Sequence, residues 1–332
     1  MNVAVVGSGA WGTALALQLY KNGHRTLLWT HDAEKASQMR NSVINARLEG
    51  ISLPKDLEIT ADTADLQDRM LVIVATPSVY FRSTCKVIAA HLHKDAVLVS
   101  VTKGVESGTL MRMSQIAKEE TGHPVVVLTG PNHAEEVARN IPTAAVVACE
   151  TKELAEMVQG ALTSDTFRVY TSPDVIGAEL GGAMKNVIAL CAGVCDGLGY
   201  GDNTKAMLMT RGLTEIARLG VAMGASRDTF AGLAGMGDLI VTCTSMHSRN
   251  RRAGILIGQG KTAEEAMSQV GAIVEGYYAA KSSYEIAQKH GVEMPIITAA
   301  YSTLYQGVSA KQAVHSLLLR QIRPEQEDAG WN

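Results

Sequence analysis

Short apolar runs recur through the first half of the chain and are separated by more polar segments. A run in which nearly every position is apolar is typical of a parallel strand covered on both faces, because a strand with one wet face would alternate. Such runs, and two less regular ones, predict strands at Asn2–Val6, Arg25–Thr30, Leu71–Ala75, Ala96–Val101, Val125–Thr129, Ala144–Ala148 and Phe167–Tyr170. The pattern predicts an α/β fold built on a doubly wound, mostly parallel sheet.

From about residue 175 the pattern changes to helical segments alone. After a first helix around 181–195, we expect helices at Thr204–Met223, Thr229–Ala234, Asn250–Gly258, Thr262–Val270, Gly276–His290 and Ile296–Tyr305. The chain is long enough for two domains with substantial cores. We therefore predict a sheet domain over residues 1–175 and an all-α domain over residues 176–332, with a solvated tail from about residue 321.

The stretch Gly181–Cys195 is apolar or small on nearly every side. A helix without a polar face is normally buried. Lys185 is the single charged residue between Glu179 and Asp196 in the sequence. A buried ammonium loses its hydration unless a partner or a substrate compensates, so Lys185 is a candidate functional residue.

A glycine-rich turn follows the first predicted strand and precedes a segment of helical character, Thr13–Tyr20. In this turn Gly7 permits a tight bend, Gly9 lets a pyrophosphate approach the backbone, and Gly12 lets the helix pack closely on the strand. The helix N-terminus supplies free N–H groups and a partial positive charge for phosphates. The arrangement predicts a Rossmann-type dinucleotide site.

The residues after the second predicted strand bear on the choice of dinucleotide. An NAD site usually has an acidic residue there, which holds the ribose 2′-hydroxyl. Asp32 stands twenty residues past Gly12 but two beyond the last apolar strand residue, so it can miss the ribose. His31, with Lys35 or Arg40 nearby, would instead tolerate a 2′-phosphate. We expect NADP to be accepted, and the sequence leaves NAD open.

Polar or glycine-bearing turns follow three of the later strands, at Thr76–Ser78, Thr102–Gly104 and Gly130–His133. In an open parallel sheet the ligand lies beyond the carboxyl ends of the strands, so these turns are where chemistry is expected. Lys103 is the sharpest candidate among them because it would lie beside the nicotinamide.

Two further segments in the helical half carry candidate chemistry. The glycine turn Gly235–Gly237 is followed by the carboxylate of Asp238 and, four residues later, by the hydroxyl of Thr242. Ser248 opens a helix that carries arginines and an asparagine in its first turn. N–H donors, the helix dipole and a guanidinium converge there, which favours a small phosphate group as ligand.

Composition narrows the class of protein. The chain has 332 residues, of which 46% are hydrophobic and 19% charged, as expected for a globular protein. Its formal net charge of −3 gives no general attraction to nucleic acid or anionic membrane, so an anionic ligand needs a local cationic cluster. Five cysteines without a C-x-x-C pair indicate reduced thiols in the cytoplasm. We expect no signal peptide, no membrane insertion, no metal and no nucleic-acid partner.

Seven motifs occur in an order that closely resembles bacterial NAD(P)-dependent glycerol-3-phosphate dehydrogenases. The resemblance covers residues 1 to about 320. It rests on Gly7-Ser8-Gly9-Ala10-Trp11-Gly12, Val101-Thr102-Lys103-Gly104, Gly130-Pro131, the run Gly181 to Asn186, Gly237-Asp238-Leu239, Ser248-Arg249-Asn250 and Val274-Glu275-Gly276. It implies a Rossmann-type sheet domain followed by an all-α domain like the C-terminal domain of 6-phosphogluconate dehydrogenase.

The resemblance also implies residue roles. The catalytic pair would be Lys185 and Asp238. The dinucleotide would be bound by Gly7, Ser8, Gly9, Ala10, Trp11, Gly12, His31, Lys103, Ala134, Arg249, Ile273 and Glu275. The substrate would be bound by Lys103, Gly130, Asn132, Lys185, Asp238, Thr242, Ser248, Arg249 and Asn250. Ala10 stands where many relatives carry serine, so a backbone N–H contact to the pyrophosphate is expected there but a hydroxyl contact is not. Asn132 stands where relatives often carry serine or threonine, so the resemblance supports a role of its side chain less strongly than it supports Gly130.

The resemblance implies reversible hydride transfer between NAD(P)H and dihydroxyacetone phosphate, giving sn-glycerol 3-phosphate for glycerophospholipid synthesis. In this reaction Lys185 would carry the proton, since burial and a neighbouring cation lower a lysine pKa while Asp238 opposes that change. Two alternatives stay open: another Rossmann dehydrogenase of the 2-hydroxyacid type, and a dinucleotide-sensing protein without chemistry. The partners expected are a small-molecule substrate and a second copy of the chain in a homodimer.

Overall fold

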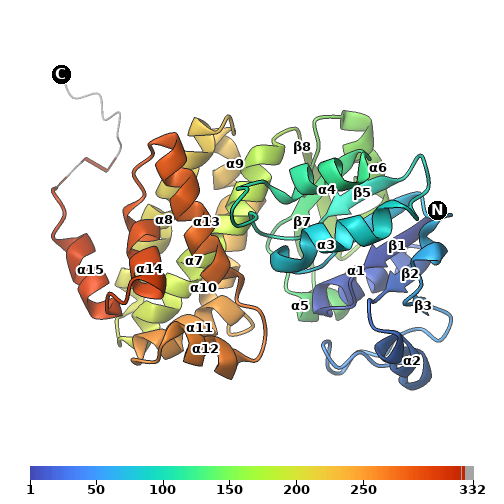
Figure 1. The fold of residues 1–332 in the computed structure, drawn as a ribbon, viewed down its shortest axis with the longest axis horizontal. Helices are drawn as coiled ribbons and strands as arrows, with labels where there is room; N and C mark the ends of the chain where they lie inside the picture. The colour runs from blue at the N-terminus through green and yellow to red at the C-terminus, as the bar shows by residue number, and fades with distance from the viewer. Residues whose placement is uncertain (323, 326–332) are drawn as a thin grey trace.

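The computed structural model describes residues 1–322 and 324–325, and within them eight strands form one sheet in the order β3-β2-β1-β4-β5-β6-β7-β8. Figure 1 shows this sheet with its helices in one half of the molecule and a bundle of helices in the other. The strands are β1 (Asn2–Val6), β2 (Arg25–Trp29), β3 (Glu58–Thr60), β4 (Leu71–Val74), β5 (Val97–Ser100), β6 (Val125–Thr129), β7 (Thr143–Ala148) and β8 (Phe167–Ser172).

The central strand β1 illustrates why the apolar runs predict strands correctly. Its register is parallel to β2 on one side and β4 on the other, with Val5 opposite both Leu28 and Ile73. Successive side chains of β1 enter different hydrophobic clusters, Val5 on one face of the sheet and Val6 on the other. Both faces are covered, so neither side of the strand tolerates polar residues.

Helices cover both faces of this sheet. One cluster includes α1 (Ala10–Lys21) and α6 (Lys152–Leu162), and another includes α3 (Ser78–Ala89) and α4 (Met113–Thr121). The remaining helices of this half are α2 (Ala33–Ser42), a 3₁₀ turn at Thr63–Leu66, and α5 (Ala134–Ala138). The strand order reverses between β1 and β4, which opens a crevice for a ligand beyond the carboxyl ends of these strands.

The expectation that the run 144–148 is a parallel strand is wrong with respect to β6. β7 pairs antiparallel with β6, with Leu128 opposite Val147, and parallel with β8. A parallel pairing with β6 would need a crossover along the sheet, whereas α5 has only five residues. The chain therefore turns back, and Thr143 at the start of β7 comes to lie near the end of β6. The short edge strand β3 was also not predicted, because its three residues have no apolar run.

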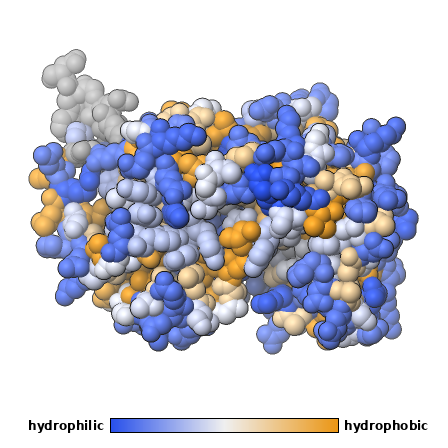
Figure 2. All heavy atoms as spheres, viewed as in Figure 1, coloured by the Kyte–Doolittle hydropathy of each residue, from blue (hydrophilic) through white to orange (hydrophobic). Residues whose placement is uncertain are grey.

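The helical half is arranged around α7 (Val175–Gly197), most of whose residues are buried. The other helices are α8 (Asp202–Ala222), α9 (Arg227–Ala231), α10 (Asp238–Thr244), α11 (Arg249–Gly258), α12 (Ala263–Val270), α13 (Glu275–His290), α14 (Pro295–Tyr305) and α15 (Ala310–Leu318). A Cβ atom on Gly193 would lie 2.0 Å from the carbonyl oxygen of Arg251, so a glycine is needed where α7 crosses α11. Figure 2 shows hydrophilic side chains over much of the outer surface of both halves.

By length and composition α7 is apolar enough to span a membrane, but 83% of its most apolar window is buried inside the fold. The segment expected as a glycine turn carrying Asp238 differs from the prediction, because Asp238 is the first residue of helix α10 and follows a π-helical turn at Leu233–Gly237. α15 was not predicted. Most of the expected tail from residue 321 lies outside the described residues.

Candidate active site

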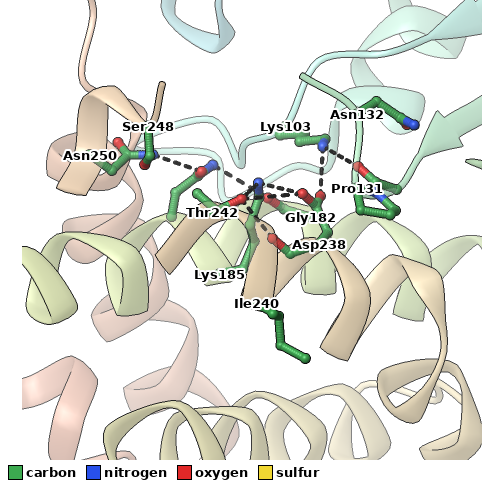
Figure 3. A network of polar contacts seen from close by, with 12 residues as sticks. Lys103, Pro131, Asn132, Gly182, Lys185, Asp238, Ile240, Thr242, Ser248 and Asn250 are labelled. Carbon is green, nitrogen blue, oxygen red and sulfur yellow. Dashed lines mark hydrogen bonds and ion pairs between the residues drawn. The ribbon is translucent and has the colours of Figure 1, made fainter. Parts of the chain in front are cut away.

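Lys185 meets a carboxylate and a hydroxyl inside the helical half. Its Nζ atom donates to Asp238 Oδ1 at 2.6 Å and to Thr242 Oγ1 at 2.5 Å. Lys185 is 5% exposed and Asp238 1%. Both partners come from α10, whose first turn faces α7 (Figure 3). The lone buried ammonium expected from the sequence therefore has the compensation that burial requires.

The second oxygen of the same carboxylate binds a lysine from the sheet half. Lys103 Nζ donates to Asp238 Oδ2 at 2.6 Å and to the carbonyl oxygen of Gly130 at 2.9 Å. The Lys103 side chain is 22% exposed, so it forms the side of the network that solvent reaches. Asp238 thus binds both Lys185 and Lys103, as Figure 3 shows. Its contact with Lys103 links the helical half to the sheet half.

The environment brings Lys185 near the range of a general acid or base. Burial lowers the pKa of Lys185, and Lys103 lowers it further, although Asp238 opposes both, so that the pKa is about 8. Burial alone would raise the pKa of Asp238, but the two ammonium groups hold it below its usual value. Asp238 is therefore ionised at neutral pH, and Lys185 can change its protonation state near the working pH of an enzyme.

Two glycines of α7 let the helix approach its neighbours closely enough to build this network. A Cβ atom on Gly181 would lie 2.5 Å from the carbonyl oxygen of Ala234 in the π-helical turn. One on Gly182 would lie 2.9 Å from the hydroxyl of Thr129, at the end of β6. A side chain at either position would push α7 away, so the glycines before Lys185 determine its distance from both α10 and the sheet.

The beginning of α11 forms a second polar group beside this network. Ser248 caps the helix by accepting from the Arg251 N–H at 3.2 Å, and both Ser248 and Asn250 are buried. The Asn250 side chain donates to Asn186 Oδ1 at 2.8 Å and accepts from the Gly276 N–H at 2.8 Å. Asn186 was missed as a site residue, although a polar residue directly after Lys185 in an apolar helix is a signal of the same kind.

Arg249, between Ser248 and Asn250, is exposed to solvent. Its guanidinium is therefore accessible to an anion at the first turn of α11, where the helix dipole adds a partial positive charge. This arrangement suits one phosphate group.

The glycine turn after β1 has the geometry that a dinucleotide needs. Gly7 has φ of 117°, and a Cβ atom on Gly12 would lie 1.9 Å from the carbonyl oxygen of Gly7. Nothing lies within 4 Å of a Cβ built on Gly9, so this face of the turn is open. The first turn of α1 lacks a side-chain cap at Gly9, which leaves its N–H groups to a ligand. These residues fit a pyrophosphate.

Cationic groups surround the end of β2, and one oxygen of the nearby carboxylate is already used. Asp32 accepts from the Lys35 N–H at 3.0 Å and so caps α2. Lys35 Nζ donates to the carbonyl oxygen of Ser8 at 3.0 Å. Burial lowers the pKa of Lys35, and the positive charge of the nearby Arg47 lowers it further. His31 is exposed at the same end of the sheet.

Other residues expected at the site have different orientations. Asn132 points toward β7, away from Lys185 (Figure 3), and donates to Thr143 Oγ1 at 3.1 Å and to the Ala144 carbonyl at 2.9 Å. Glu275 binds Ser78, with its Oε1 accepting from the N–H at 3.1 Å. Ala134 begins α5 and is buried, whereas Trp11 and Ile273 are half-buried. In the described part of the chain no group of three His, Cys, Asp or Glu side chains could hold a metal ion.

The chain is similar to known proteins over nearly its whole length. Two family models match the chain: the N-terminal part of NAD-dependent glycerol-3-phosphate dehydrogenase over residues 2–155, and its C-terminal part over residues 174–315. A glycerol-3-phosphate dehydrogenase [NAD(P)+] of Thermoanaerobacter sp. (strain X514) is 48% identical over 98% of this chain and 99% of the relative. One of Pelotomaculum thermopropionicum is 50% identical over 98% of this chain and 95% of the relative.

A solved structure, the glycerol-3-phosphate dehydrogenase from Coxiella burnetii, superimposes with a TM-score of 0.92 at 36% identity. The match covers 96% of this chain and 99% of that one.

Proposed function

Since the chain belongs to the NAD-dependent glycerol-3-phosphate dehydrogenase family, we propose that it interconverts dihydroxyacetone phosphate and sn-glycerol 3-phosphate, with Lys185 as its acid and base. The observation that carries this assignment is the buried contact of Lys185 with Asp238, to which Lys103 adds a second cation. A proton donor of this kind, in a chain that also has an open dinucleotide turn, suits the reduction of a ketone.

The turn Gly7–Gly12 would hold the dinucleotide, NADPH or NADH, which would supply the hydride chemistry of the reaction. In reduction Lys185 donates a proton from Nζ to the oxygen that becomes the secondary alcohol, and in oxidation it removes that proton. Asp238 keeps the ammonium oriented and charged until the proton leaves. Lys103, on the solvent side of the same carboxylate, adds positive charge where the oxygen becomes negative.

The substrate phosphate is held at the first turn of α11. Arg249 is exposed there, and it supplies the charge that complements the helix dipole. Ser248 and Asn250 shape the turn, because the serine caps it and the asparagine ties it to Asn186 and Gly276. A carboxylate substrate would lack the tetrahedral anion that this turn suits, which disfavours a 2-hydroxyacid.

NADPH is the preferred dinucleotide. Asp32 Oδ1 is used as a helix cap, which leaves the other oxygen of this carboxylate for a ribose 2′-hydroxyl. Lys35 and Arg47 give this end of the sheet the positive charge that a 2′-phosphate needs, and the exposed His31 lies at the same end.

The remaining expectations belong to the same proposal. A division near residue 175 separates the dinucleotide domain from the substrate domain, since the last strand ends at Ser172 and α7 begins at Val175. The five free cysteines support a reducing compartment, the cytoplasm. There the product would serve glycerophospholipid synthesis. A homodimer without membrane insertion is the expected form, and light scattering of the purified chain tests it.

A substrate panel tests the function. Absorbance of the reduced nicotinamide should fall rapidly when the purified chain receives NADPH and dihydroxyacetone phosphate. It should fall slowly with dihydroxyacetone and with 2-oxo acids. Rapid turnover of an oxo acid would favour a 2-hydroxyacid dehydrogenase, and dinucleotide binding without turnover of any ketone would favour a sensor. Repeating the reaction with NADH measures the cofactor preference.

A further inference from the structure

A carboxylate of the helical half caps a helix of the sheet half at Ser78. The Oε1 atom of Glu275, the first residue of α13, accepts from the Ser78 N–H at 3.1 Å, and its Oε2 accepts from the Ser78 hydroxyl at 2.5 Å. Ser78 is the first residue of α3, whose own N-cap position is Pro77 and provides no side-chain acceptor. The N–H group of the first residue of α3 thus finds its acceptor in the other half of the molecule.

A second carboxylate of the helical half does the same for α4. Glu179 of α7 accepts from the Ser114 N–H at 2.8 Å and from the Ser114 hydroxyl at 2.6 Å, and it also forms an ion pair with Arg112. Glu179 is 5% exposed. Ser114 lies in the first turn of α4, whose N-cap residue Arg112 again provides no side-chain cap.

We call these two contacts the carboxylate–serine clamps, Glu275–Ser78 and Glu179–Ser114. They share one design. In each, a negative charge from the helical half binds both the backbone N–H and the hydroxyl of a serine at a positive helix end. Neither N-cap side chain accepts from its own helix, although at α4 the Gln115 side chain accepts from the Arg112 N–H at 3.0 Å. Opening the two halves would therefore expose the Ser78 and Ser114 N–H groups, which the closed form satisfies.

The clamps lie at the two ends of the loop that carries Lys103. Gly104, the next residue, packs so tightly on Ser78 that a Cβ atom would lie 2.5 Å from the serine Cβ. The loop ends at Arg112, which forms a β-bridge with Val105 and pairs with Glu179. One clamp therefore fixes the start of the loop and the other its end.

Glu179 also lies six residues before Lys185 on α7, about 9 Å along the helix axis. The helix that carries the proton donor thus holds the loop that carries Lys103. The same loop contacts the helical half a second time, since Lys103 Nζ donates to Asp238 Oδ2 at 2.6 Å.

We propose that Ser78, Ser114, Glu179 and Glu275 are positioning residues for the reaction: the two carboxylate–serine clamps hold the halves closed so that Lys103 stays on Asp238 beside Lys185. This inference rests on the proposed function, because it assigns the clamps to that same site. The clamps act through the Lys103 loop and supply no proton themselves.

The test compares Ser78→Ala and Ser114→Ala with the wild-type chain in NADPH-dependent reduction of dihydroxyacetone phosphate. Displacing Lys103 by a fraction of an ångström should lower kcat about tenfold, since misplacement by about 1 Å costs up to about 100-fold. The Michaelis constant for the ketone should change less than about twofold, because the phosphate turn on α11 is untouched. Ser114→Thr keeps the hydroxyl that Glu179 accepts from and should restore most of the rate.

The pH profile supplies a readout that a purely structural role would not move. Lys103 lowers the pKa of Lys185, which is about 8. If Lys103 moves away from Asp238, the pKa of Lys185 should rise, and the alkaline limb of kcat/KM for reduction should move to higher pH. Both serine variants and Glu179→Gln should show this upward movement.

Glu215→Gln is the matched control. Glu215 is also a buried carboxylate that caps a helix, since it accepts from the Ile296 N–H at 2.9 Å, but both partners belong to the helical half. This variant should melt earlier and keep the wild-type kcat and pH limb. Unchanged kinetics in both serine variants would overturn the proposal, and so would a change in Glu215→Gln as large as the change in the serine variants. An effect at one serine alone would overturn the proposal for the other clamp. A wild-type chain that does not reduce dihydroxyacetone phosphate would instead refute the proposed function.

Discussion

Replacing Asp238 by asparagine removes the carboxylate that Lys185 and Lys103 share while keeping the shape of the side chain. Each ammonium lies 2.6 Å from one of its oxygens. With about 4 Å between charge centres and an effective dielectric constant of about 20, one such pair is worth about 4 kcal/mol. The asparagine oxygen would retain part of this through its dipole, so we expect the Lys185 pKa to fall by about 2 units.

The pKa of Lys185 would then move from about 8 to about 6, within the range of buried lysines without an anion. At pH 7 the protonated fraction of Lys185 would fall from about nine-tenths to about one-tenth. Since reduction needs the protonated form, kcat/KM for dihydroxyacetone phosphate at pH 7 should drop about tenfold from this cause alone. Oxidation needs the neutral form, and its acidic limb should move down by the same amount.

The assay is kcat/KM for NADPH-dependent reduction between about pH 5 and pH 9.5, for the wild-type chain and Asp238→Asn. The position of the alkaline limb is the readout, because a loss of geometry lowers the whole curve without moving it. Thr242→Val is the control: it removes a neutral contact of Lys185 and should move the limb by less than one unit. A limb that stays near 8 in Asp238→Asn would refute the assignment of the limb to Lys185.

Three further outcomes follow from the site and its surroundings. Arg249→Ala should raise the Michaelis constant for dihydroxyacetone phosphate at least about tenfold but that for dihydroxyacetone less than about twofold, since only the former carries a phosphate; equal effects would argue against a phosphate contact. Lys35→Ala should weaken NADPH binding, followed by fluorescence titration, several times more than NADH binding, and a uniform loss would remove Lys35 from the 2′-phosphate site. Burial raises the pKa of Glu215 from 4.5 to about 7. Its folded form therefore contributes stability that is present below about pH 4.5 and lost as the pH rises through about 7, so the difference in unfolding free energy between wild type and Glu215→Gln should fall by about 3 kcal/mol across that range. A constant difference in urea titrations would contradict the raised pKa.

The sequence predicts best those parts of the fold that are buried on every side, because only apolar or small side chains fit there. The run 2–6 predicts β1 because both faces of the sheet demand apolar side chains, and Lys185 is conspicuous because α7 is buried all round. The direction of β7 was not predictable in the same way. Its residues satisfy a covered strand in either direction, and the length of α5 decides between them.

Contacts between distant segments explain the rest of the difference. Asp32 has the spacing of a ribose ligand, but its carboxylate caps α2 through a bond that depends on where β2 ends. Glu179 has no local signal at all, because its partner Ser114 lies 65 residues earlier in the chain. Asp238 was found from its motif, whereas its binding of two lysines at once required the closed arrangement of the halves.

In the proposed reaction Lys185 transfers the proton while other residues hold the dinucleotide. The most direct test pairs turnover with binding in Lys185→Met, which keeps a side chain of similar length without the ammonium. We expect reduction of dihydroxyacetone phosphate to fall at least about 1,000-fold while the dissociation constant for NADPH stays within about threefold of wild type. Turnover near the wild-type rate in a folded Lys185→Met chain would contradict this role of Lys185.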